Sequence, residues 1–212
     1  MIILPQQGLG FIAVTKCAST SIEAALKGYD VFATGGTAGL KHLPYRHVEK
    51  FVLPLLDAFD MKRPHFFAVV RHPAARVLSW YNFRTRENIE NKKNTRNTTR
   101  HVGDLSLEEF VDLAIAGKKG PYGRVKPQHK YLTDAKDNVA VQTLIKIEYL
   151  DELLPGFLAR FGIEMAAAPT RRNISPTTVT GNMPEDLVRK IVSSTRFGLD
   201  MELYDQGIAT LS

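Results

Sequence analysis

Runs rich in apolar residues alternate with amphipathic segments along most of this chain. The apolar runs lie at about Phe11–Val14, Phe66–Val70 and Val139–Ile147, and the first is typical of a strand buried on both faces. Helices are expected at about Ser19–Lys27, Val48–Phe59, Pro73–Arg86, Ser106–Ala116, Leu150–Phe161 and Pro184–Thr195. Strands and helices that alternate at this length predict an α/β fold with a central parallel sheet flanked by helices.

Local residue choices support several of these helices. Ser106 and Glu109 form a capping box at the start of one helix, and Pro73 suits the first turn of another. Pro54 limits the regularity of its helix, and Pro155 predicts a kink. Loops are expected at Thr34–Gly39 and Gly117–Gly123.

Length and composition favour one ordinary globular domain over residues 1–212. The chain has 212 residues, enough for a sizeable core, and 44% of them are hydrophobic. Residues 84–100 are the exception, with six Lys or Arg among many Asn and Thr. This stretch is predicted to be a solvated, mobile basic loop.

The net charge of +6 and the isoelectric point near 9.4 favour an anionic partner. Nucleic acid, an acidic glycan, a phosphorylated cofactor and lipid headgroups all qualify, as does a basic protein without any such partner. No zinc-finger, RRM, KH or clear helix-turn-helix signature supports nucleic acid.

Cysteine usage and hydropathy bound the cellular setting. The one cysteine, Cys17, cannot form an intrachain disulfide, and it disfavours a cysteine-based metal site. No apolar run reaches the roughly 18 residues of a membrane span, and Met1–Gly10 lacks the pattern of a signal peptide. We expect a cytoplasmic protein if the chain is full length, or an anchored or luminal domain if it is truncated.

The first strand-to-helix connection has the chemistry of an anion cradle. It reads Lys16-Cys17-Ala18-Ser19-Thr20-Ser21, so small residues, hydroxyl groups and one cation precede a helix N-terminus. The alternative is an ordinary Ser/Thr N-cap beside a surface lysine. The Walker A pattern is absent, which disfavours a magnesium-dependent nucleotide hydrolase.

A second cation follows the next buried strand. Arg71 comes directly after Phe66–Val70, and Ser79 lies on the helix behind it. A guanidinium suits phosphate oxygens because its donors form a planar fork. A helix-flanking ion pair and a tolerated helical serine are the alternatives. Two such units together favour a nucleotide-type ligand that is held at both ends.

These residues resemble the sulfotransferases. The segment Lys16–Ser21 is similar to their 5′-phosphosulfate loop, and Arg71 with Ser79 resembles their 3′-phosphate motif. The resemblance implies a P-loop-like fold and the cofactor 3′-phosphoadenosine 5′-phosphosulfate (PAPS), which leaves as 3′-phosphoadenosine 5′-phosphate (PAP). It also implies transfer of a sulfuryl group to a hydroxyl or amine with no metal. The implied cofactor contacts are Lys16, Cys17, Ala18, Ser19, Thr20, Ser21, Arg71, Ser79 and, in a basic C-terminal loop, Arg172.

Further segments resemble the membrane-associated carbohydrate branch of that family, which implies a glycan acceptor. They are Pro127-Gln128, Tyr131-Leu132, Ile147-Glu148-Tyr149-Leu150 and Asn173-Ile174-Ser175. The candidate contacts to that acceptor are His42, Arg84 and Arg86. If the acceptor is acidic, the basic loop would hold it. A solvated loop without a ligand is the alternative for residues 84–100.

Sulfuryl transfer needs stabilisation of the departing phosphate and a base for the attacking hydroxyl. Lys16 is the candidate for the first role. For the second, Tyr45-Arg46-His47-Val48 resembles the His-x-His-Val segment of the heparan and uronyl 2-O-sulfotransferases, which implies His47. Tyr45 departs from that pattern, so His42 and Glu49 remain alternatives.

Two other classes of function stay open. The first is another P-loop-like small-molecule transferase or kinase, which stabilisation by ATP with Mg²⁺ would favour. The second is a non-catalytic module that binds acidic glycans through the basic loop. The sequence leaves the acceptor and the oligomeric state undetermined.

Overall fold

A computed structural model describes residues 1–212 except 27, 30, 91–104, 118–124, 166–178 and 211–212. The chain divides into two compact units. The first comprises Met1–Arg71, Gln128–Ile174 and Leu203–Ser212, and the second comprises His72–Pro127 and Ser175–Glu202. That the whole chain acts as a single domain stays a prediction.

The first unit is built on a five-stranded mixed sheet in the order β3-β1-β2-β4-β5. Strands β2, β4 and β5 are parallel, and β1 pairs antiparallel with β2 and β3. The expected α/β architecture with a parallel centre is therefore confirmed, and an antiparallel edge extends it. The strands are β1 (Ile2–Leu4), β2 (Leu9–Phe11), β3 (Phe32–Ala33), β4 (His65–Val70) and β5 (Thr143–Lys146).

The antiparallel edge comes from an N-terminal hairpin that the sequence analysis did not include. Gly8 adopts a φ of 62°, and its N–H donates to the Pro5 carbonyl at 3.3 Å, which closes the turn between β1 and β2. Strand β2 ends at Phe11, earlier than predicted. The Ile12 N–H still donates to the Phe67 carbonyl at 3.0 Å, so the chain stays close to β4 as it leaves the ladder.

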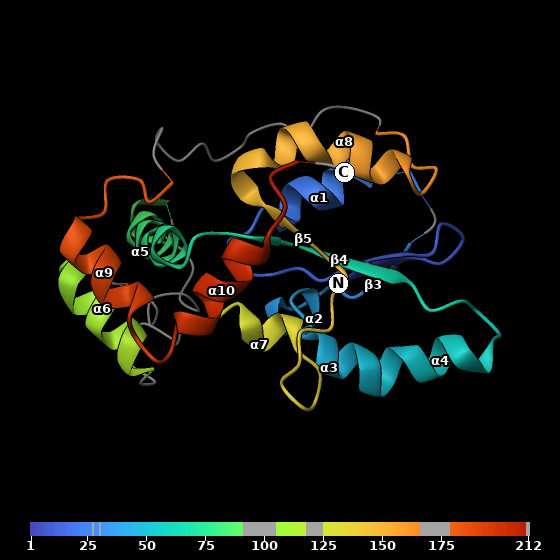
Figure 1. Cartoon of the computed structure of the whole chain (residues 1–212), viewed down its shortest axis with the longest axis horizontal. Coiled ribbons are helices and arrows are strands. Elements are labelled where there is room, and N and C mark those ends of the chain that lie inside the picture. Colours follow the sequence, from blue (N-terminus) through green and yellow to red (C-terminus); the bar gives the residue numbers. More distant parts are fainter. Residues whose placement is uncertain (27, 30, 91–104, 118–124, 166–178, 211–212) are drawn as a thin grey trace. The chain divides into compact units, whose positions relative to one another are not determined.

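Helices cover both faces of this sheet (Figure 1). Helices α1 (Ser19–Ala25) and α8 (Leu150–Ala159) lie on one face, and α3 (Tyr45–His47) and α4 (Leu53–Ala58) lie on the other. The ring of Phe67 on β4 packs between Phe11 and Phe157, with centroid separations of 5.0 Å to each. This aromatic contact joins β2, β4 and α8. Shorter helices are α2 (Ala38–Lys41), α7 (His129–Leu132) and the 3-10 turn η3 (Ile147–Tyr149).

The predicted helix at Val48–Phe59 contains a change of helical form. A π-helical segment, η1 (Val48–Val52), joins α3 to α4, and Pro54 lies in the first turn of α4. A proline has no N–H to donate and its ring crowds the carbonyl four residues earlier, so a wider turn before it relieves that crowding.

The second unit is helical. Helices α5 (Pro73–Glu90), α6 (Leu107–Ala116) and α9 (Glu185–Val192) pack on one another around Val77, Phe110 and Ile191. The predicted capping box is confirmed: the Glu109 N–H donates to Ser106 Oγ at 3.2 Å, and the Ser106 N–H donates to Glu109 Oε2 at 2.8 Å. Helix α10 (Gly198–Gln206) has its first residues, up to Glu202, in the second unit and its others in the first.

Gly10 allows a close approach between β2 and β4. A Cβ atom at this position would overlap the ring of Phe66, which is buried. We expect Gly10→Ala to lower the free energy of unfolding by about 1–3 kcal/mol, the usual cost of overpacking. Urea denaturation would measure it. Gly35→Ala is the control because nothing lies within 4 Å of its Cβ position, and an equal loss there would contradict the packing argument.

Candidate functional site

The connection between β2 and α1 is a strained turn. Lys16 and Ala18 adopt φ values of 65° and 54°, in the left-handed region that residues other than glycine seldom occupy. The Cys17 N–H donates to the Val14 carbonyl at 3.3 Å between them. Left-handed residues in a turn gather successive N–H groups into a concave surface that suits an anion. Strain of this kind concentrates at functional sites.

Helix α1 begins without a side-chain cap. Its N-cap residue is Ala18, so the alternative that this segment is an ordinary Ser/Thr N-cap is wrong. The N–H groups of Ser19 and Thr20 donate no hydrogen bond to any described residue. The Ser19 side chain is buried, Ser21 is half-buried and Thr20 is exposed. Donors are therefore left at the turn for a ligand.

Gln128 connects this turn to the end of β4. Its side chain is fully buried, and its Oε1 accepts from Cys17 Sγ at 3.3 Å and from the Arg71 N–H at 3.0 Å. Its Nε2 donates to the Arg71 carbonyl at 2.7 Å. The two cations predicted from sequence are thus borne by backbone segments that share one buried amide. From the sequence, Gln128 was recognisable only as a family landmark without a role.

Helix α7 supports the same turn at a second point. Tyr131, which is buried, hydrogen bonds through its hydroxyl to Thr15 Oγ1 at 3.3 Å. Gln128 and Tyr131 are three positions apart, a spacing that puts both side chains on one side of the segment. In the sequence, this three-residue spacing is the trace that the support leaves.

His42 is held at the base of the turn. Its Nδ1 lies 2.8 Å from the carbonyl oxygen of Ala13. Because a carbonyl only accepts, Nδ1 carries the proton and Nε2 keeps a lone pair in the neutral ring. Burial lowers the pKa of His42 below its usual 6.5, and the charge of Lys41 lowers it further. His42 is therefore a neutral, oriented imidazole at neutral pH.

His47 and Glu49 lie farther along the chain. His47 ends α3 and is half-buried, with its ring 6.2 Å from that of Phe51. Glu49 is exposed within η1. Helix α3 packs against α7, which contacts the strained turn. The role of either side chain as a base stays a prediction.

Arg71 is half-buried and follows Val70, the last residue of β4 to pair with β5. The charge of Arg71 affects the pKa of an acidic residue of the same unit, Glu148. Burial raises the pKa of Glu148, and the positive charge of Arg71 acts in the opposite direction. Glu148 Oε2 is buried with no hydrogen-bond partner among the described residues.

Ser79 is half-buried on α5 in the second unit, whereas Arg71 belongs to the first. Near the start of α5, Arg76 is fully buried, and its Nη2 donates to the Lys126 carbonyl at 2.7 Å. The Arg76 N–H donates to the carbonyl of His72, which is buried. Sequence analysis gave Arg76 no role.

Arg84 differs from its expected place in a solvated loop. Helix α5 continues to Glu90, and Arg84 is 4% exposed, with its guanidinium carbon 4.7 Å from the Trp80 ring centre and 5.4 Å from that of Phe110. Aromatic faces attract the cation, which favours its burial on the helix over exposure in a solvated loop. Arg86 is also in α5, but its side chain lies outside the described residues, as do Arg172 and 91–104.

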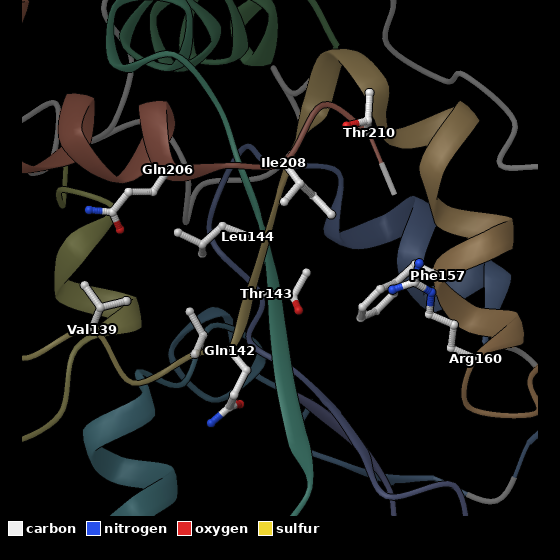
Figure 2. Close-up of a pocket in the computed structure, with 10 residues that line it drawn as sticks. Val139, Gln142, Thr143, Leu144, Phe157, Arg160, Gln206, Ile208 and Thr210 are labelled. Atoms are coloured by element: carbon white, nitrogen blue, oxygen red, sulfur yellow. The ribbon is translucent and has the colours of Figure 1, made fainter. Parts of the chain in front are cut away.

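A cavity of about 270 Å³ lies along β5 (Figure 2). Thr143 and Leu144 come from the strand, Phe157 comes from α8 and Arg160 directly follows that helix, and Ile208 comes from the C-terminal segment. Thr143 pairs with Phe67, toward the amino half of β4, whereas Arg71 follows its carboxyl end. No predicted site residue lines this cavity, so the candidate site is assigned from the turn and its contacts.

Clustered metal ligands and membrane-spanning helices are both absent from the described residues. No three His, Cys, Asp or Glu side chains come together as metal ligands, and the expectation that no metal is needed stays a prediction. No helix in the described part of the chain has the length and hydropathy to cross a membrane.

A family model described as the sulfotransferase family matches residues 1–205. The chain belongs to the sulfotransferase family. The matched range contains the strained turn, Arg71 and Gln128. Membership makes the chain a transferase of sulfuryl groups in general. It also agrees with the P-loop-like α/β fold. A comparison with curated proteins found no match.

The strain at Ala18 is testable. Ala18→Gly removes the Cβ that disfavours the left-handed region, so we expect the free energy of unfolding to rise by about 1 kcal/mol. The control is Ala24→Gly, an exposed position in α1, where we expect a loss of about 0.5–1 kcal/mol. Chemical denaturation measures both. Losses of the same size at both positions would show that Ala18 carries no strain.

Proposed function

We propose that this sulfotransferase moves the sulfuryl group of PAPS to a hydroxyl group of a carbohydrate acceptor and forms PAP. The observation that carries the proposal is the junction at Gln128, where the turn of Lys16 and the backbone of Arg71 meet on one buried amide. Such a junction suits a donor that has anionic groups at two ends.

The residues of the turn fit a phosphosulfate. From Thr15 to Ser21 there is one cation, four hydroxyl side chains and no acidic residue. The N–H groups of Ser19 and Thr20 are donors without a partner in the described chain. Arg71 supplies a forked donor for a second phosphate, at a backbone position that Gln128 fixes.

Lys16 would stabilise negative charge. When bound, PAPS supplies an activated sulfuryl group whose in-line transfer leaves a phosphate. Charge develops on that phosphate, so a cation and fixed N–H donors lower the barrier most if they are already oriented. The strained backbone at Lys16 and Ala18 provides such orientation before any ligand arrives.

The base for the acceptor hydroxyl is a choice between two histidines. The family resemblance implies His47, and the geometry of the described residues supports His42. His42 is bonded to Ala13, the residue two places before the turn begins at Thr15, and its lone pair is on Nε2. We assign the base to His42, and His47 is the alternative that kinetics will decide.

A carbohydrate acceptor rests on two supports. Segments distributed along the chain resemble the carbohydrate branch of the family, and the net charge of +6 favours an acceptor that carries carboxylate or sulfate groups. Arg84 is buried against aromatic rings, so it does not enter this proposal as an acceptor contact.

Binding of PAP tests the donor site. We expect PAP to raise the melting temperature and Arg71→Ala to remove most of that shift, because the 3′-phosphate loses its forked donor. Arg63→Ala is the control, since Arg63 is exposed and pairs with Asp57. Thermal unfolding with PAP, or with ATP and Mg²⁺, would measure the effect. If ATP with Mg²⁺ raises the melting temperature and PAP does not, the result contradicts the proposed donor and favours a kinase.

Kinetics test the base. We expect His42→Ala to lower kcat by about 10²–10⁴ with PAP binding retained, and His47→Ala to have a smaller effect. Burial lowers the pKa of His42, so kcat/KM should decrease only as the pH falls below 6.5, where this base becomes protonated. The decrease should be absent in His42→Ala. Radiolabelled PAPS with a glycan panel gives these rates. A larger loss of kcat in His47→Ala than in His42→Ala would assign the base to His47.

A further inference from the structure

The amide of Gln128 hydrogen bonds to both Cys17 and Arg71 while fully buried. One oxygen accepts from both Cys17 and Arg71, and the nitrogen donates back to Arg71. The backbone of Arg71 offers one donor and one acceptor, so only one orientation of the amide satisfies both. The side chain is therefore fixed in place and in direction.

This contact continues the pairing of β4 beyond the sheet. The last backbone pair of β4 with β5 joins Val70 to Lys146. At the next residue, Arg71, the side-chain amide of Gln128 exchanges both hydrogen bonds with the backbone, as a neighbouring strand would. Arg71 thus has the positional constraint of a strand residue although the strand has ended.

The same amide limits where the strained turn can lie. Cys17 is between the two left-handed residues, Lys16 and Ala18, and its thiol donates to the oxygen that also binds Arg71. A movement of the turn away from β4 would break this hydrogen bond between two buried groups. The Gln128 amide consequently restrains the distance between the turn and the Arg71 backbone.

We propose that Gln128 is a positioning residue that sets the spacing between the two anion sites and so selects nucleotides phosphorylated at both the 5′ and 3′ positions. The inference rests on the proposed function. Gln128 itself binds no part of the ligand. A ligand with two phosphates gains from both sites only when their separation matches its own, whereas a ligand with one phosphate is nearly indifferent to that separation.

The measurement is the ratio of the dissociation constants for adenosine 5′-phosphate and PAP, obtained by calorimetry. We expect Gln128→Ala to reduce this ratio by about tenfold, the effect of roughly one well-placed hydrogen bond. A general loss of stability would weaken both ligands alike and leave the ratio unchanged.

The control is Gln142→Ala. Gln142 also binds the backbone of β4 through its side chain, because its Oε1 accepts from the Phe66 N–H at 2.7 Å, but it does so at the amino half of the strand. We expect the ratio of dissociation constants in Gln142→Ala to equal that of the unmodified protein. An unchanged ratio in Gln128→Ala overturns the inference. Failure of the unmodified protein to prefer PAP overturns the proposed function instead.

A second variant gives an answer even if Gln128→Ala folds poorly. In Gln128→Glu, a protonated carboxyl can donate to the Arg71 carbonyl and accept from its N–H, as the amide does, whereas an ionised carboxylate only accepts and repels that carbonyl. Burial raises the carboxyl pKa, so the neutral form persists at mildly acidic pH. Relative to the unmodified protein at each pH, the ratio should be near normal in acid and fall as the pH rises. A reduction that is the same at every pH overturns the inference.

Discussion

The pairing between the Gln128 amide and the Arg71 backbone is the constraint on which the candidate site depends. It joins segments around positions 17, 71 and 128, which are distant in sequence and meet only in the folded first unit. No local segment can form this arrangement alone, so the site exists only after the sheet has formed. The Gln128 amide links these segments only after the long loops between them have closed, and that closure costs conformational entropy.

A rigid support of this kind also explains how the turn can keep an unfavourable backbone. Two residues other than glycine in the left-handed region cost roughly 1–3 kcal/mol each and persist only where the surroundings hold them. Three hydrogen bonds hold the turn here. The Cys17 thiol donates to Gln128, the hydroxyl groups of Thr15 and Tyr131 contact each other, and the Cys17 N–H donates to the Val14 carbonyl. Glycine would adopt this backbone without strain, but at position 16 it would remove the cation that Lys16 supplies.

The sequence was sufficient for features set by local chemistry. The apolar run of β4, the capping box at Ser106 and the small, cationic character of the turn all follow from neighbouring residues. It was insufficient where distant partners decide. The burial of Arg84 depends on Phe110 of another helix, and the role of Gln128 depends on two other segments. The hairpin edge was missed because strands of two or three residues give too short a pattern to recognise.

The thiol beneath the turn offers a direct view of its motion. Cys17 is the single cysteine of the chain, it is fully buried, and its proton is engaged by Gln128. A thiol-specific reagent can react only when the turn opens, so the rate of labelling in the native protein reports the free energy of that local opening. The chain therefore carries its own kinetic sensor at the point where the two anion sites are joined.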